Sequence, residues 1–207
     1  MFCVIKMTDI INDKRNIKEL SITLLEIADC NLLLSTIGLE NEQVLKQIGD
    51  DVNPIGWIFG HCASHMDFIC GELCQGYRKL SEEEGACYSF GVSKDEINEG
   101  LPTSFMELME SYLMIRKDAF DYLNKLPEEK FREAPEADAG KKSKESLMQS
   151  IQRVALHFMG HMGQIILIRR AIGNPGFGFV AGMTKENREK RIAQWMKWWE
   201  DNKEKFS

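Results

Sequence analysis

Apolar residues recur at every third or fourth position over most of the chain, a pattern that predicts α-helices. Four long segments carry it, at about residues 16–39, 53–75, 103–126 and 143–172. A further amphipathic segment follows at about residues 185–203, and a short helix is expected near residues 41–48. The period-two alternation typical of β-strands is sparse. The sequence therefore predicts an all-α fold, a bundle of four long helices with an extra C-terminal helix.

Capping and helix-breaking residues divide these segments. Asn53 and Pro54 supply an N-cap and a first-turn proline, and Ser143 is expected to begin the fourth long helix. Residues 76–100 and 128–142 show little periodicity and are expected to be connections, the second an exposed charged loop. A chain of 207 residues fits one domain. We assign residues 1–207 to it, with a bundle core at about 16–173 and a C-terminal extension at about 184–204.

The first long segment carries polar residues on its apolar face. Asn31 and Ser35 either lie at the surface edge of this face or line a solvated pocket. The face selected by the helical period contains Ile17, Leu20, Leu24, Ile27, Asn31, Leu34 and Ser35.

Charge and cysteine content narrow the partners and the compartment. The chain has 26 Lys and Arg against 32 Asp and Glu, a formal net charge of −6. Proteins that bind nucleic acids or anionic membranes normally carry a basic excess, so neither partner is expected. No stretch resembles a signal peptide or approaches the roughly 18 apolar residues that span a bilayer. The six cysteines are therefore expected to be reduced and mostly buried, in a cytoplasmic protein.

All four histidines fall into two pairs with a spacing of four residues, His61 with His65 and His157 with His161. Residues four apart lie on one side of a helix, so each pair can direct two imidazoles to one point. The pairs lie on the apolar sides of the second and fourth long helices, which face a common interior in a bundle. Imidazole suits zinc, nickel, copper and iron. The alternative is that these histidines are buried in the core with their ring nitrogens hydrogen-bonded. Because this alternative does not explain why every histidine is paired, we interpret the pattern as a metal site.

The surroundings of the histidines restrict the chemistry of such a site. Cys62 and Phe158 follow His61 and His157, so the H-E-x-x-H motif with its glutamate base is absent. Three neutral imidazoles around a divalent cation attract an anion, which favours a thiol as the incoming nucleophile because a thiol needs little help from a base. Nearby glycines either permit close helix approach or make room for metal and substrate. These are Gly56, Gly60, Gly160 and Gly163.

Two runs of sequence carry a resemblance to a known family, Asn53-Pro-Ile-Gly-Trp-Ile-Phe-Gly-His61 and His157-Phe-Met-Gly-His161-Met-Gly-Gln164. Over about residues 16–173 the chain resembles the DinB/YfiT-like superfamily of metalloenzymes. The resemblance implies an up-up-down-down four-helix bundle and a homodimer. It also implies a metal triad of His61, His157 and His161 that binds zinc or nickel. Family members with known activity include transferases and isomerases that use low-molecular-weight thiols.

Two residues beside the triad are candidates for a catalytic role. His65 is either a fourth metal ligand, an acid–base group or a packed side chain, and we expect it at the pocket wall. Gln164 shares the face of His157 and His161, and it either orients a ligand or substrate or packs between helices.

Two further groups have open roles. Tyr112 and Arg116 either reach the pocket, where Arg116 would pair with an anionic substrate, or lie at the edge of the core. The tryptophans of the last segment are expected to dock it on the bundle, with a cap over the pocket or a dimer interface as the alternative. They are Trp195, Trp198 and Trp199.

Together these features predict a metal-dependent enzyme, a transferase that acts on a small-molecule substrate with a low-molecular-weight thiol. A non-catalytic metal-binding bundle is the alternative if four histidines close the coordination shell. A metal-dependent hydrolase would need a carboxylate from outside the motifs, and Asp67 and Glu72 on the second long helix are poorly phased with His61.

Overall fold

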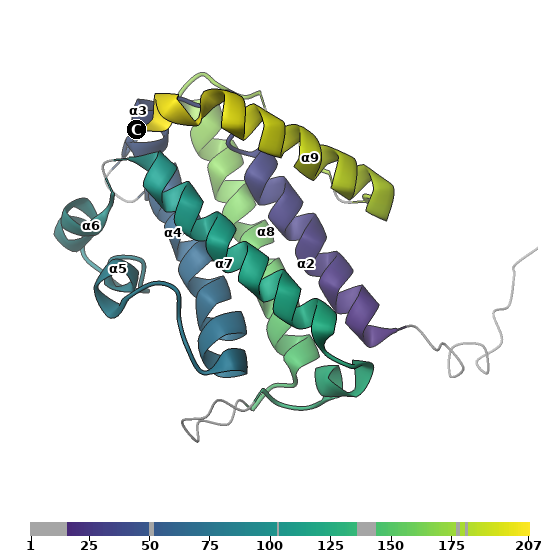
Figure 1. Ribbon diagram of the computed structural model, residues 1–207. Coiled ribbons are helices and arrows are strands. Elements are labelled where there is room, and N and C mark those ends of the chain that lie inside the picture. The colour runs from purple at the N-terminus through teal and green to yellow at the C-terminus, as the bar shows by residue number, and fades with distance from the viewer. Residues whose placement is uncertain (1–15, 50–51, 103, 136–143, 177–178, 181) are drawn as a thin grey trace, which may run out of the picture.

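The structure is a computed structural model that describes residues 16–49, 52–102, 104–135, 144–176, 179–180 and 182–207. Within these ranges it contains helices and no β-strand, only an isolated bridge between Gly49 and Val52. Four long helices lie side by side (Figure 1): α2 (Ile17–Leu34), α4 (Ile55–Met66), α7 (Phe105–Lys125) and α8 (Leu147–Ala171). None of the described helices has both the length and the apolar content needed to cross a membrane. The expected all-α fold is confirmed.

Contacts between helix ends fix the directions of three long helices. The backbone N–H of Ile17 donates to the Glu128 carboxylate at 2.9 Å, so α2 begins beside the point where α7 has just ended. Arg169, near the end of α8, donates to the carbonyl of Ser35 just beyond α2. Helix α2 therefore runs antiparallel to α7 and parallel to α8.

The direction of α4 departs from the expected order. A π-helix, η1 (Asp67–Leu73), continues α4, and Tyr122 near the end of α7 donates to the carbonyl of Cys74 just beyond it at 3.1 Å. Helices α4 and α7 are thus parallel, and the order along the chain is up, down, down, up. The expected up-up-down-down order is wrong, because the connection through α3 (Asn41–Leu45) stays at the end of the bundle where α2 and α8 end, and α4 begins there.

The long connection between α4 and α7 is folded. It contains α5 (Glu82–Ala86) and α6 (Lys94–Gly100), each begun by a capping box, at Ser81 and Ser93. The expected long connection is present, but its two helices were not predicted, because helices of five and seven residues are too short to display a helical period. The expected exposed loop after α7 likewise begins with a 3-10 helix, η2 (Glu128–Arg132), that buries Phe131.

The long helices after α2 begin within a few residues of the expected positions. Pro54, not Asn53, is the N-cap of α4, and it provides no side-chain cap. Ser104 and Ser146 cap α7 and α8 with their side chains. The expected start at Ser143 lies outside the described residues.

A buried carboxylate determines which face of α2 is turned inward. Leu20 and Leu24, expected on the buried face, are 47% and 37% exposed, whereas Asp29 is fully buried. Asp29 accepts hydrogen bonds from the Tyr112 hydroxyl at 2.7 Å and from Arg116 Nε at 2.8 and 2.9 Å. A polar residue therefore holds an inward position that the apolar pattern assigned elsewhere. Tyr112 and Arg116 serve this contact between α2 and α7 and do not reach the histidines.

The other polar residues of the first segment are also structural. Asn31 and Ser35 are fully buried, so neither the surface edge nor a solvated pocket describes them. The Asn31 side chain donates to the carbonyl of Val180 and accepts from its N–H, at 3.0 and 3.1 Å. The Ser35 hydroxyl donates to the carbonyl of Leu32. Asn31 thereby ties the segment that leads to the last helix against the bundle.

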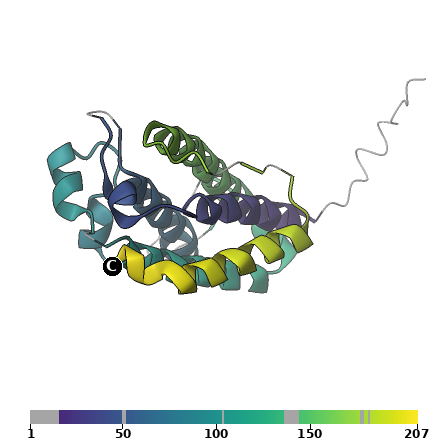
Figure 2. The same ribbon diagram turned by 90° about the horizontal axis from the view of Figure 1, so that it is seen from above.

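The last helix, α9 (Lys185–Asn202), lies along α2 and is followed by a 3-10 helix, η3 (Lys203–Phe206) (Figures 1 and 2). Trp195 and Trp199 are buried with their rings stacked at 5.8 Å between centroids. Trp195 Nε1 donates to Thr36 Oγ1 at 3.0 Å, and Trp199 contacts Phe105 of α7. The tryptophans dock the helix on the bundle, as expected.

The cysteines of the described residues are free thiols, as expected for a reduced protein. Four are buried and Cys74 is half-buried, whereas Cys3 lies outside the described residues. Burial raises the pKa of the Cys74 thiol to about 12 and keeps it protonated. The buried thiols are Cys30, Cys62, Cys70 and Cys87.

We expect Asp29→Ala to lower the free energy of unfolding by about 3–5 kcal/mol, because it leaves the Arg116 guanidinium without its buried partner. Tyr112→Phe removes one hydrogen bond to a charged group and is expected to cost about 1.5–3 kcal/mol. Urea unfolding measures both changes. Lys117→Ala, which breaks an exposed ion pair with Asp121 on α7, is the control and should leave the midpoint unchanged. Equal urea midpoints for Asp29→Ala and Lys117→Ala would contradict the role of Asp29 as the buried partner of Arg116.

Candidate metal centre

Three histidines converge between α4 and α8. His61 lies in α4, and His157 and His161 lie one turn apart in α8. The nitrogen atoms that they can offer to a metal lie within 4.8 Å of one another. Helices α4 and α8 pack side by side, and the spacing of four residues places both α8 histidines towards α4. Within the described part of the chain, no carboxylate or cysteine joins this group.

A backbone carbonyl fixes the orientation of His61. Its Nδ1 lies 2.6 Å from the carbonyl oxygen of Tyr88, in the loop after α5. A carbonyl only accepts hydrogen bonds, so Nδ1 carries the proton and Nε2 keeps its lone pair. Sequence reasoning missed Tyr88, because a residue that acts through its backbone leaves no mark of its own type.

Trp57 and Gly60 of α4 support this arrangement. The Trp57 ring stacks on His61 at 4.8 Å between centroids, and its Nε1 donates to the carbonyl of Cys87 at 2.6 Å. A Cβ at Gly60 would lie 2.2 Å from the Tyr88 ring, so only glycine permits the loop to approach. Trp57 was also missed, although its spacing of four residues from His61 is a usable signal.

The glycines of α8 behave differently from Gly60. Gly160 and Gly163 lie on the exposed side of the helix, and a Cβ at either position would meet nothing within 4 Å. Neither close helix approach nor space for a ligand therefore requires them. At Gly56 an added Cβ would lie 3.1 Å from Leu45 of α3, a close helix contact.

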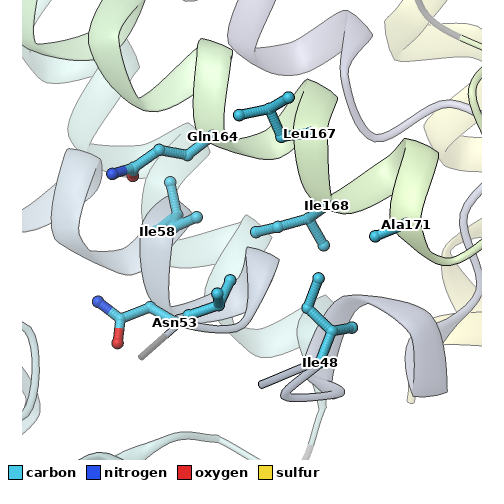
Figure 3. A pocket seen from close by; sticks show the side chains of 8 residues that line it. Ile48, Asn53, Ile58, Gln164, Leu167, Ile168 and Ala171 are labelled. Atoms are coloured by element: carbon cyan, nitrogen blue, oxygen red, sulfur yellow. The ribbon is translucent and has the colours of Figure 1, made fainter. Parts of the chain in front are cut away.

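Gln164 orients His161 from the next turn of α8. Its Oε1 lies 2.7 Å from Nδ1 of His161, which assigns the proton to Nδ1 and leaves Nε2 free. The rest of the Gln164 side chain lines an apolar groove of about 350 Å³. Figure 3 shows it with Leu167 and Ile168 of α8, across from Ile48 and Ile58. This contact orients a histidine of the triad, and the expected role of Gln164 in orienting a ligand or substrate stays a prediction.

His157 has a buried ring nitrogen, Nε2, that nothing in the described residues satisfies with a hydrogen bond. Burial first, and then the neighbouring imidazoles, lower the pKa of His157 to about 3. Burial also lowers the pKa of His161. Both rings are therefore neutral near pH 7, the form that binds metals.

His65 lies next to the triad without converging on it. Its ring stacks on His157 at 4.3 Å between centroids, but its nitrogens are not among those that lie within 4.8 Å of one another. Burial, and then the charge of Arg153, lower the pKa of His65 to about 4. Its Nε2 is buried and has no hydrogen-bond partner in the described residues. His65 lines the pocket that opens beside His61, and its role there stays a prediction.

We expect the metal-free protein to lose stability as the pH falls below about 6.5. The folded state holds the pKa values of His65 and His157 at about 4 and about 3, against 6.5 ordinarily. Between these values the unfolded chain binds more protons, so stability is present above the ordinary pKa and is lost as the pH falls. Urea unfolding with a chelator, at about pH 7.5, 6 and 5, measures the slope. The double variant His65→Gln/His157→Gln should make the free energy of unfolding less dependent on pH. An unchanged dependence would show that these two histidines do not cause it.

Comparison with known protein families identifies the fold. A family model for the DinB superfamily matches residues 31–165, which include all three converging histidines and Gln164. No significant match was found among curated proteins or among solved structures. The family match spans well over half of the chain, in agreement with its helical architecture and with the resemblance of its histidine motifs. The chain belongs to the DinB superfamily.

Proposed function

We propose that this protein is a metal-dependent enzyme in which His61, His157 and His161 bind a zinc or nickel ion. We further propose that it is a transferase that acts on a small-molecule substrate with a low-molecular-weight thiol. The convergence of three imidazole nitrogens within 4.8 Å carries the proposal. The absence of a basic excess supports a function without nucleic acid or membrane surfaces. A homodimer, which the resemblance implied, and a cytoplasmic location, which the cysteine content and the lack of a recognisable signal peptide favoured, belong to the same proposal.

The chemistry of the group fits a divalent metal. His61 and His161 each commit Nδ1 to an acceptor, so Nε2 is their free ligand atom. The buried Nε2 of His157 has no partner among the described residues. Such a group costs about 1–3 kcal/mol, which a metal ligand bond would offset.

The number of converging histidines favours an enzyme over a structural site. Structural zinc sites have four protein ligands, whereas catalytic sites have three and keep one position open. His65 remains outside the convergent group. The triad therefore leaves room for a ligand from solution, which the alternative of a closed four-histidine shell would exclude.

The acidic residues near the triad favour a thiol over hydrolysis. Asp67 accepts hydrogen bonds from the backbone N–H groups of Lys79 and Leu80 and is 2% exposed. These hydrogen bonds hold Asp67 against the connection between α4 and α7, so it does not serve as a base. A bound divalent ion would stabilise a thiolate by its charge. The chain contributes rings fixed by Tyr88 and Gln164 and surroundings that partly exclude water.

We expect purified protein to bind one zinc or nickel ion per chain and His157→Ala to abolish this binding, because two imidazoles remain. To measure this binding, each protein is treated with a chelator, repleted with zinc or nickel and desalted, and its metal content is then determined. His65→Ala is the matched control on the same ring stack and should retain the metal. Metal retained in His157→Ala, or lost equally in His65→Ala, would refute the assignment.

We also expect an open coordination position to be detectable with a thiol. Addition of 2-mercaptoethanol to cobalt(II)-substituted protein should change its visible absorption spectrum, because sulfur enters the coordination shell. Addition of ethanol is the control and should leave the spectrum unchanged. A spectrum unaffected by the thiol would favour a closed, non-catalytic site.

A further inference from the structure

A pocket of about 250 Å³ opens beside the triad, between α4 and the connection that contains α5. His61 forms part of its wall, so a ligand in the pocket lies next to the proposed metal position. No acidic side chain is among its described lining residues, and Arg78 carries its formal charge. The pocket therefore combines proximity to the triad with a guanidinium in its wall.

Hydrogen bonds to Ser64 hold one edge of the Arg78 guanidinium. Nη2 donates to the backbone oxygen and the hydroxyl of Ser64, both at 3.2 Å. Nε is buried without a hydrogen-bond partner and forms ion pairs with the carboxylates of Asp67 and Glu72, at 3.9 and 3.7 Å. No hydrogen bond from Nη1 occurs within the described residues. The side chain is 29% exposed, which leaves it accessible from the pocket.

The two carboxylates that pair with Arg78 lie outside the pocket lining, so the guanidinium is the charged group that faces the pocket. The buried Asp67 carboxylate receives two backbone N–H groups, and Lys79 forms an ion pair with Asp118 at 3.4 Å. Glu72 is partly exposed and lies outside the pocket lining. A divalent ion at the triad would add further positive charge.

Aromatic side chains flank the cationic group. The Arg78 guanidinium lies 5.7 Å from the centre of the Phe68 ring. Phe90 is fully exposed and also lines the pocket, although an exposed phenylalanine contributes nothing to the core. A planar guanidinium matches the two oxygens of a carboxylate, and aromatic walls match an apolar body.

We propose that this pocket binds the carboxylate end of the substrate, a small carboxylic acid with an apolar body, and that Arg78 is its anchor. The inference rests on the proposed function because the triad is taken as the reacting centre beside it. Arg78 fixes the carboxylate, while Phe68 and Phe90 contact the apolar part of the molecule.

Benzoate is a suitable probe and benzamide its neutral counterpart of the same shape. Titrations followed by ligand-observed NMR are made with chelated protein and repeated with zinc. We expect the wild-type protein to bind benzoate more tightly than benzamide, and Arg78→Gln to weaken benzoate binding about tenfold with little effect on benzamide. Lys79→Gln removes the neighbouring charge outside the pocket and should bind benzoate as the wild type does.

A second variant does not depend on the fold tolerating a change at Arg78. Phe90→Glu places a negative charge at the exposed rim and should weaken benzoate binding more than benzamide binding. Equal benzoate affinity in wild type, Arg78→Gln and Phe90→Glu, or equal loss in Lys79→Gln, would overturn the subsite. Zinc retained in His157→Ala would instead refute the metal site. The titrations with chelated protein would still test the role of Arg78, because they do not involve the metal.

Discussion

The hydrogen bond between His61 and the backbone carbonyl of Tyr88 is the contact on which the histidine cluster depends. It places the proton on Nδ1 and leaves Nε2 free, facing the two histidines of α8. The bond forms only because the loop after α5 approaches α4 closely, and that approach requires the absence of a side chain at Gly60. The connection between α4 and α7 is therefore part of the site.

Burial of the imidazoles gives the cluster its chemical character. His157 has no hydrogen-bond partner for its buried Nε2 among the described residues, and its pKa is depressed to about 3. A neutral, desolvated ring of this kind is costly in the empty protein and well suited to a metal. The same helix also carries Gln164, whose amide orients His161 and lines the neighbouring groove. Folding thus keeps the rings of His157 and His161 neutral, and aims the three rings at one another, before any ligand binds.

The sequence predicted more of the histidine cluster than of the residues and short helices that hold the surrounding structure in place. The spacing of four residues in α8 placed His157 and His161 together, and the motif around His61 added the third histidine. The role of Asp29 was not predictable in this way, because a buried carboxylate is recognised only with the Tyr112 hydroxyl and the Arg116 guanidinium beside it. The inward face of α2 was misassigned for that reason. Short helices such as α5 escaped prediction because their length gives no period.

By itself the sequence determined that the chain is helical, that its long helices form a bundle and that its histidines occur in pairs one turn apart. These properties follow from the local geometry of the α-helix, in which side chains recur every 3.6 residues. Only the tertiary structure decided the up-down-down-up order, the separation of His65 from the convergent triad and the position of Arg78 beside it. Each of these depends on which segments distant in sequence come into contact, and local periodicity carries no record of that choice.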